Sequence, residues 1–264
     1  MGAAIAAPVC VAIITFAAFL PVLRAGFVAW DDDKNFTDNP MYRGLGPDQL
    51  RWMWTTFHMG HYVPLSWMTL GLDYELWGMN PAGYHLSNLL LHTASAIVVY
   101  FLARRLLAGP RSERSQNGVR LDLADAKSSL TPFFAAAFAA LAFAVHPLRV
   151  ESVAWVTERR DVLSGLFYFS SVLAYLRSHD AGRGVGWYVA ALVLFVAALL
   201  SKATAMTLPA VLLLVEVYPL RRLGGAIGWW SAAARRVYAK LVPFAALAVA
   251  AAALSIIALH PPSQ

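Results

Sequence analysis

Long apolar stretches separated by short charged ones dominate the pattern of this chain. An uncharged apolar stretch of about 18 or more residues is long enough to cross the hydrocarbon core of a membrane as a helix. Several stretches reach or approach this length, and they predict seven spans, at about Ala3–Leu23, Tyr84–Ala103, Leu130–Val145, Val162–Leu176, Val185–Leu200, Ala203–Pro219 and Leu241–Leu259. The predicted fold class is therefore all-α, a polytopic membrane helix bundle.

The fourth span is the shortest and the most charged at its ends. A helix of fifteen residues rises only about 22 Å, against a hydrocarbon core of about 30 Å. Asp161 and Arg177 lie at its two ends, so both must reach the interface, Arg177 by extending its long side chain towards water.

The connection between the first two spans, at about 24–83, is long and carries helical patterns of its own. Pro47, followed by an acid in the first turn, is typical of a helix start. A second candidate, Pro64–Trp77, is rich in Trp, Met and Leu. Aromatic amphipathic helices of this kind lie in the membrane interface, which is our interpretation. The alternative is a loop domain packed on itself.

Composition agrees with a single membrane domain over residues 1–264. The chain is 59% hydrophobic and only 14% charged, and its mean hydropathy is +0.57, so there is no soluble core to assemble. The N-terminus lacks the basic region of a secretory signal, which favours a retained first span. Cys10 is the only cysteine, so no intrachain disulfide can form.

The distribution of charge between the spans predicts the orientation. One alternate set of connections holds thirteen of the twenty-one basic residues and four acids, while the opposite set holds eight basic residues and ten acids. The positive-inside rule then places the N-terminus and the first set in the cytoplasm. The basic pI of about 9.6 is thus a signal of topology, and we expect no nucleic-acid partner.

Three adjacent acids, Asp31, Asp32 and Asp33, follow the first span on the predicted outer side. Carboxylates in such a cluster can act as a general base or bind a divalent cation through oxygen. Asp31 and Asp33 have the Asp-x-Asp spacing that a metal would use. The alternative is a solvated turn that keeps the acids out of lipid.

The second outer connection is unusually charged for its length. Three of its acids, Glu151, Glu158 and Asp161, would share one face of a helix. Two of its guanidinium groups, Arg149 and Arg159, can bind a phosphate through paired hydrogen bonds. The alternative is internal pairing between arginines and carboxylates.

Three further features lie near or within the spans. Lys202, a lone cation between two apolar runs, either meets an anionic partner or extends to the interface. His85, Asn88 and His92 share one helix face, which we interpret as a structural stripe rather than a metal site. Glu216, near the cytoplasmic end of the sixth span, is expected to pair with a basic neighbour.

Several blocks of the chain occur together in a familiar order. They are Gly26–Asp33, Gly60–Ser66, Gly83–His92, His146–Val153, Arg159–Ser164, Ser201-Lys202 and Tyr218–Leu220. In this order they resemble the membrane half of transmembrane O-mannosyltransferases that carry tetratricopeptide repeats, and their bacterial relatives. These proteins belong to the class C glycosyltransferase superfamily, and the resemblance covers nearly the whole chain.

The resemblance implies sugar transfer from a polyprenyl-phosphate-linked donor to an acceptor protein, at a site on the outer side of the lipid bilayer. Its catalytic acids map onto Asp31 and Asp32, with Asp31 the better match. The donor phosphate would be bound by Arg159, Lys202 and Arg149, with support from His146, Glu151, Asp161, His61 and His85. A divalent metal, if one is used, would be held by Asp31 and Asp33.

The family's members continue with further spans and a soluble repeat domain, whereas this sequence stops after the seventh predicted span. The resemblance therefore implies a truncated form. The Pro- and Trp-rich loop blocks favour the bacterial relatives, and hence a bacterial inner membrane over the endoplasmic reticulum.

Two other functions remain open from the residues alone. A transporter or flippase of lipid-linked substrates would depend on the stripe from His85 to His92. A membrane assembly subunit without chemistry would tolerate neutralisation of the outer acids.

Overall fold

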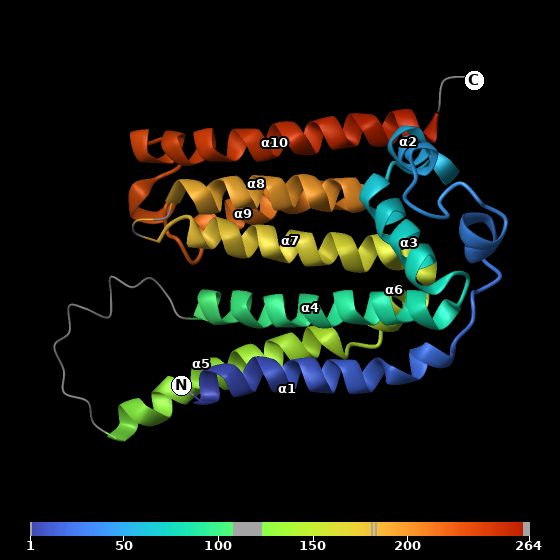
Figure 1. Ribbon diagram of the computed structural model, residues 1–264. Coiled ribbons are helices and arrows are strands. Elements are labelled where there is room, and N and C mark those ends of the chain that lie inside the picture. The colour runs from blue at the N-terminus through green and yellow to red at the C-terminus, as the bar shows by residue number, and fades with distance from the viewer. Residues whose placement is uncertain (1, 108–122, 181, 183, 261–264) are drawn as a thin grey trace.

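The computed structural model of the chain describes residues 2–107, 123–180, 182 and 184–260. Within these residues every regular element is a helix or a helical turn (Figure 1). The predicted all-α class is therefore confirmed.

The bundle of the described chain is built from long helices that run alongside one another. They are α1 (Gly2–Phe19), α4 (Pro81–Leu107), α5 (Leu123–Ala144), α7 (Arg159–Arg177), α8 (Gly184–Ser201), α9 (Leu208–Val217) and α10 (Ala232–Leu259). Short helical turns extend two of them, η1 (Leu20–Arg24) after α1 and η5 (Ala203–Thr207) before α9. All seven predicted spans thus correspond to helical segments.

Four of these segments are long and apolar enough to cross a membrane. They cover Ile5–Arg24, Pro81–Leu107, Gly184–Ser201 and Ala232–Leu259, and they correspond to the first, second, fifth and seventh predicted spans. The third and sixth contain shorter apolar helices, Pro132–Ala144 and Ala203–Val217. The fourth corresponds to α7, whose ends carry the charges noted in the sequence. Membrane crossing by these three stays a prediction.

Helix α7 is central to the bundle, between α4 on one side and α8 on the other (Figure 1). Its apolar face joins α8, α9 and α10 in the largest apolar cluster of the described chain, around Tyr175, Phe195 and Phe244. A second cluster joins α1, α4 and α5 around Val11 and Tyr100. Because lipid tails are as apolar as these side chains, the helices of a membrane bundle are held together by close packing of such clusters rather than by transfer of the side chains out of water.

The long first loop folds into a compact cap on one end of the bundle. It contains the helices α2 (Pro47–Thr55) and α3 (Pro64–Trp77), and each begins with a proline, as the sequence indicated. A buried aromatic cluster around Phe36, Tyr42 and Trp67 packs the loop on itself and onto Tyr84 of α4. These contacts match the alternative of a loop domain packed on itself.

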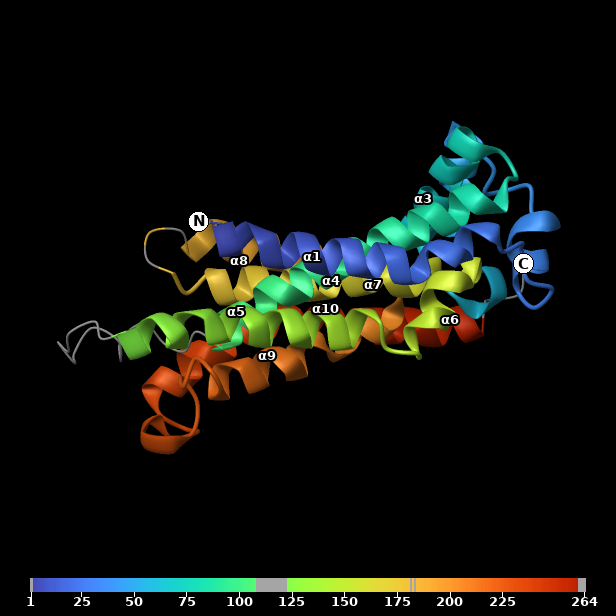
Figure 2. The same ribbon diagram turned by 90° about the horizontal axis from the view of Figure 1, so that it is seen from below.

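Helix α3 is also inclined to the bundle (Figure 2). It exposes Leu72, Leu76 and Trp77, so an interfacial position stays a prediction for this helix. Gly71 on its inner side is required, because a Cβ there would lie 2.7 Å from the carbonyl oxygen of Gly44. This close approach fixes α3 against the loop and sets the position of Asp73 two residues later.

The described parts of the two predicted sets of charged connections lie at opposite ends of the bundle, while the basic residues between 108 and 122 and Arg183 lie outside the described residues. The cap and the helix α6 (Arg149–Ala154) are at one end, and the start of α10 with the ion pair between Arg105 and Asp180 is at the other (Figure 1). This separation is what the charge pattern requires. Which end faces the cytoplasm stays a prediction from the positive-inside rule.

Candidate active site

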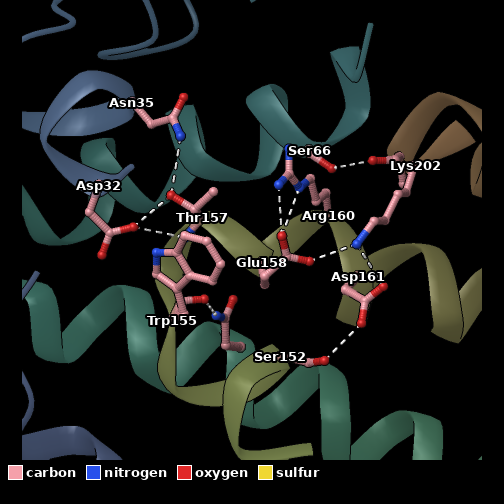
Figure 3. A network of polar contacts seen from close by, with 12 residues as sticks. Asp32, Asn35, Ser66, Ser152, Trp155, Thr157, Glu158, Arg160, Asp161 and Lys202 are labelled. Carbon is pink, nitrogen blue, oxygen red and sulfur yellow. Dashed lines mark hydrogen bonds and ion pairs between the residues drawn. The ribbon is translucent and has the colours of Figure 1, made fainter. Parts of the chain in front are cut away.

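The neighbouring acids Asp31 and Asp32 have opposite surroundings. Asp32 is fully buried. One of its carboxylate oxygens accepts a hydrogen bond from the Val28 amide (2.9 Å), and the other accepts from both the amide (3.0 Å) and the hydroxyl (2.6 Å) of Thr157 (Figure 3). Asp32 therefore joins the first loop to the second outer connection, and its oxygens are occupied.

Asp31 is half-buried and lines a pocket. Thr157 lines the same pocket, but it donates its hydrogen bonds to Asp32 and not to Asp31. The pocket has an empty volume of about 430 Å³, part of it open to solvent. Its other walls are Asn35, Phe36, His58, Met59, His61, Val63, Ser66, Trp67, Leu70, Thr157 and Arg160; we call it the Asp31 pocket.

The carboxylate of Asp31 makes no hydrogen bond or ion pair with any residue that the structure describes. A carboxylate in a pocket without a partner is available to an external donor, such as the hydroxyl of a substrate. The resemblance indicated both Asp31 and Asp32. Of these two carboxylates, only that of Asp31 has no hydrogen-bond donor among the described residues.

An ionic network borders the Asp31 pocket on the side of α7 and η5. Glu158 accepts from the guanidinium of Arg160 (2.7 Å to Nη2) and from the ammonium of Lys202 (2.7 Å) (Figure 3). Lys202 also donates to Asp161 (3.0 Å), whose second oxygen accepts from Ser152 (2.7 Å). The four ionised groups cancel in charge, and each keeps some exposure to solvent.

The network shifts the titration of groups at its edges. Burial alone would raise the pKa of the Asp161 carboxyl, but the hydrogen bond from Ser152 and the ammonium of Lys202 hold that pKa below its ordinary value. Burial lowers the pKa of the His61 imidazole, and the guanidinium of Arg160 lowers it further. At neutral pH the cation on the wall of the Asp31 pocket is therefore Arg160.

Arg159 lies apart from the pocket, fully buried between α7, α3 and α4. Its guanidinium forms an ion pair with Asp73, and it also donates to the Asn88 side chain and to the Tyr84 carbonyl oxygen (3.0 Å). The sequence indicated Arg159 as a ligand of the donor phosphate. In the structure its charge is already paired, so its position favours a structural role.

The other basic candidate, Arg149, lies on a different face of the network. Its guanidinium packs over the Phe143 ring, 4.8 Å from the ring centroid, in a second pocket that Asp161 also lines. His146 and Glu151 are exposed nearby, and neither lines the Asp31 pocket.

The polar stripe of α4 is held by backbone carbonyl groups. A ring nitrogen of His85 lies 3.3 Å from the Gly26 oxygen, and one of His92 lies 2.9 Å from the Ala144 oxygen. Asn88 donates to the carbonyl oxygens of Val153 and Trp155. These bonds connect α4 to the loops around it, in agreement with a structural stripe.

The prediction of a metal held by Asp31 and Asp33 gains little support from the side chains around these two acids. Among the described residues there is no group of three or more His, Cys, Asp and Glu side chains placed to hold a metal ion. Asp33 accepts from the amide of Lys34 (2.9 Å) and does not line the Asp31 pocket. A metal at Asp31 and Asp33 therefore stays a prediction.

Sequence reasoning missed two residues that build the site. Thr157 donates a hydrogen bond to the carboxylate of Asp32, and Asp73 forms an ion pair with Arg159. A signal for Asp73 was present, since it is one of only two acids, with Glu75, inside the apolar segment Pro64–Trp77, and such acids are paired when they are buried. Thr157 gave no comparable signal.

Comparison with known proteins identifies relatives among animal enzymes. The chain is 34% identical over 202 residues to the protein O-mannosyl-transferase Tmtc1 of Drosophila melanogaster, which is 74% of this chain and 21% of that protein. It is 31% identical over 228 residues to Tmtc2 of the same fly, covering 81% and 22%, and 33% identical over 153 residues to human TMTC4, covering 55% and 19%.

The chain therefore spans about a fifth of the length of these curated relatives. No family model matches it, and no solved structure matches it. The sequence similarity agrees with the resemblance indicated by the ordered blocks. We conclude that the chain is a relative of the protein O-mannosyl-transferases.

Proposed function

We propose that this chain carries the site at which a glycosyltransferase activates its acceptor. The reaction would move a mannose-like sugar from a polyprenyl-phosphate-linked donor to a hydroxyl group of an acceptor protein, on the non-cytoplasmic side of the membrane. The observation that carries the proposal is the unpaired carboxylate of Asp31 in a pocket beside Arg160. The names of the relatives support the class of reaction.

Asp31 would act as the general base. As the acceptor oxygen forms a bond to the anomeric carbon of the sugar, the bond from that carbon to the phosphate oxygen breaks and the phosphate leaves with the electron pair. The acceptor hydroxyl loses its proton to the Asp31 carboxylate. A positioned general base contributes about 10²–10⁴ in rate.

Negative charge grows on the phosphate as it leaves, and cations close to it lower the barrier. Arg160 lines the Asp31 pocket, and Lys202 is joined to it through Glu158. In this proposal Arg160 and Lys202 neutralise the leaving phosphate, the role that the resemblance implied for Arg159 and Lys202. Because Glu158 already balances both, a phosphate would have to share them with that carboxylate.

The walls of the Asp31 pocket suit a sugar. The aromatic rings of Phe36 and Trp67 offer apolar surface, and Asn35 and Ser66 offer polar groups at the rim. A mostly apolar wall with a few placed polar groups is typical of small-molecule sites.

The test is transfer of radiolabelled mannose from mannosyl polyprenyl phosphate to a Ser- and Thr-rich peptide, by the purified chain in liposomes. We expect Asp31→Asn to lower the rate by about 10²–10⁴, because the amide cannot accept the proton. Asp33→Asn is the matched control, since it removes the same charge two residues away, and it should change the rate less than about threefold.

An Asp31→Asn variant that keeps the full rate would contradict the assignment. The elution profile of each variant in detergent, compared with that of the unmodified chain, separates lost chemistry from lost folding.

A further inference from the structure

The segment between α9 and α10 forms a small turn at the end of the bundle opposite the cap. It projects sideways from the helices (Figure 2). Its base is fixed by the carbonyl oxygen of Glu216, which accepts hydrogen bonds from the amides of Arg222 (2.8 Å) and Leu223 (3.3 Å). The Leu223 side chain is buried in the apolar cluster around Tyr175, so the segment is anchored to the bundle.

Glycines give this turn a defined shape. Gly224 and Gly228 form a bridge, in which the amide of each donates to the carbonyl oxygen of the other (3.3 and 3.2 Å). The short helical turn η6 (Gly225–Ile227) joins them. Gly224 has a φ of +73°, which favours glycine, and a Cβ there would lie 3.2 Å from the ring of Trp229. Trp229 therefore packs on the backbone of the turn, and we call residues 224–230 the tryptophan turn.

The tryptophan turn exposes large aromatic side chains. Trp230 is 88% exposed and Trp229 is 46% exposed, and Tyr218, at the start of the same segment, is 67% exposed. Aromatic rings of this size are unfavourable in water. Trp and Tyr are enriched where a bilayer meets water, because one part of the side chain is apolar and the other can form hydrogen bonds. The exposure is therefore what a membrane surface requires.

Cations follow the two tryptophans along the chain, and no acids accompany them. After Glu216 the sequence has no Asp or Glu as far as residue 264. Arg222 is turned inward and donates to the Glu216 carboxylate (3.2 Å). In contrast, Arg235, Arg236 and Lys240 are exposed near the start of α10, and none of them forms an ion pair with the residues that the structure describes. These three side chains are open to an anionic partner.

The length of α10 places these cations at the edge of the hydrocarbon core of a membrane. The uncharged part of the helix, residues 241–259, rises about 28 Å, which is close to the core thickness of about 30 Å. The three cations then lie on the water side of the core, among the lipid head groups. The tryptophan turn directly precedes them.

We propose that the tryptophan turn and the start of α10 together bind an anionic membrane surface. The partner is a phospholipid bilayer that contains a lipid of net negative charge. Trp229 and Trp230 lie among the head groups, and the three cations contact lipid phosphates. The rings favour any bilayer, so the cations supply the preference for anionic lipid, roughly fivefold for each one near the surface.

This surface is independent of the proposed function. It lies at the end of the bundle away from the Asp31 pocket and shares no residue with the ionic network. Its role is to hold the ends of α9 and α10 at the membrane surface, since the turn is anchored to both helices.

Fluorescence quenching measures the contact between tryptophan and lipid. The purified chain is placed in nanodiscs of phosphatidylcholine and phosphatidylglycerol in equal amounts, with bromine on one of the two lipids, because bromine quenches a tryptophan that it touches. The chain has nine tryptophans, so the signal of the turn is the difference between the unmodified chain and the Trp229→Phe/Trp230→Phe variant. We expect this difference to be quenched several times more strongly when phosphatidylglycerol carries the bromine.

Charge variants, each measured with and without the two tryptophans, test the cations. Arg235→Gln together with Arg236→Gln should lower the preference for phosphatidylglycerol by about twofold to fivefold for each charge removed. Arg51→Gln is the matched control, because Arg51 is an exposed cation of the cap, at the other end of the bundle. This variant should keep the preference of the unmodified chain.

Equal quenching by the two brominated lipids would overturn the proposal, because the surface would then not distinguish anionic lipid. Quenching of the two tryptophans by acrylamide in the water, and by neither lipid, would also overturn it and would leave the surface free for a soluble protein. A test without variants is ionic strength: added salt should reduce the preference, and a preference that salt leaves unchanged would contradict the role of the cations.

Asp31→Asn should give the quenching of the unmodified chain. Failure of this surface and failure of the proposed function therefore give different results. The elution profile of each variant in detergent checks that it is folded.

Discussion

The two ends of the bundle both concentrate charged side chains, but they use them differently. At the end opposite the cap, Glu216 is fully buried and accepts from the hydroxyl of Tyr175 (2.5 Å) and from Arg222 (3.2 Å). At the end that carries the cap, the network around Glu158 and Lys202 is partly exposed and borders two pockets. The first cluster surrounds one fully buried carboxylate, whereas the second lies between two pockets.

The difference indicates which charges serve structure and which are open to a ligand. A closed buried pair contributes little net stability but is costly to break, because one partner would be left charged and unpaired. A partly exposed pair can exchange a partner at low cost. The end that carries the cap contains both kinds, since Arg159 and Asp73 are almost fully buried while Arg160 and Lys202 are partly exposed.

The largest effect that follows from this comparison concerns Arg159. Arg159→Met should lower the free energy of unfolding by about 3–5 kcal/mol, because it leaves Asp73 buried and unpaired. Arg160→Met, the same change at the next residue, should cost less, about 1 kcal/mol, because Glu158 keeps Lys202 as an ion-pair partner. Unfolding by denaturant in detergent micelles measures both, and equal losses would remove the distinction between sealed and open charges.

A middle-sized effect distinguishes the two neighbouring acids. Asp32→Ala should lower stability by about 1–3 kcal/mol, since the amide and hydroxyl of Thr157 lose their charged acceptor. Asp31→Ala should change stability by less than about 0.5 kcal/mol, as a substitution without lost contacts does. Hydrogen exchange of the first loop should rise in the Asp32 variant alone. A similar rise in both variants would contradict the separate roles.

The smallest effect is on the pH dependence of the outer network. The pKa of Asp161 is lowered in the folded chain, so its contribution to stability is present above the ordinary pKa of about 3.9 and is lost as the pH falls through the lower folded value. Lys202→Met removes a cause of that lowering, so the folded pKa moves back towards the ordinary value and the loss of stability in acid should become smaller. Thermal unfolding between about pH 3 and pH 7 measures the shift; an unchanged acid limb would exclude Lys202 as its cause.

The sequence predicted a feature well where residues close together in the chain were enough to determine it. The predicted helix Pro64–Trp77 has the observed bounds, because a proline can occupy the first turn of a helix without losing a hydrogen bond. Glu216 has the expected basic partner, Arg222, six residues away. The apolar stretches gave helices because length and hydropathy are local properties, although only four of the seven are long and apolar enough to be confirmed as candidate spans.

The candidate site was predicted in part. The charge pattern predicted that Asp31, Asp161 and Lys202 lie on the same side of the bundle, and the structure places all three at one end. The resemblance implied that Arg159 binds the donor phosphate, but the buried position of Arg159 does not favour this role. An arginine in sequence shows its charge but not its partner, and Asp73 is 86 residues away.

The sequence by itself determined the helical class, the apolar segments and the separation of charge between the two ends, since these depend on composition along the chain. Only the tertiary structure shows that Asp31 and Asp32 have different surroundings, because adjacent residues differ in what the rest of the fold places beside them. Thr157, which is 125 residues from Asp32, occupies that carboxylate and leaves Asp31 without a partner. Packing between distant segments, which no local pattern encodes, thus distinguishes an anchoring acid from an available one.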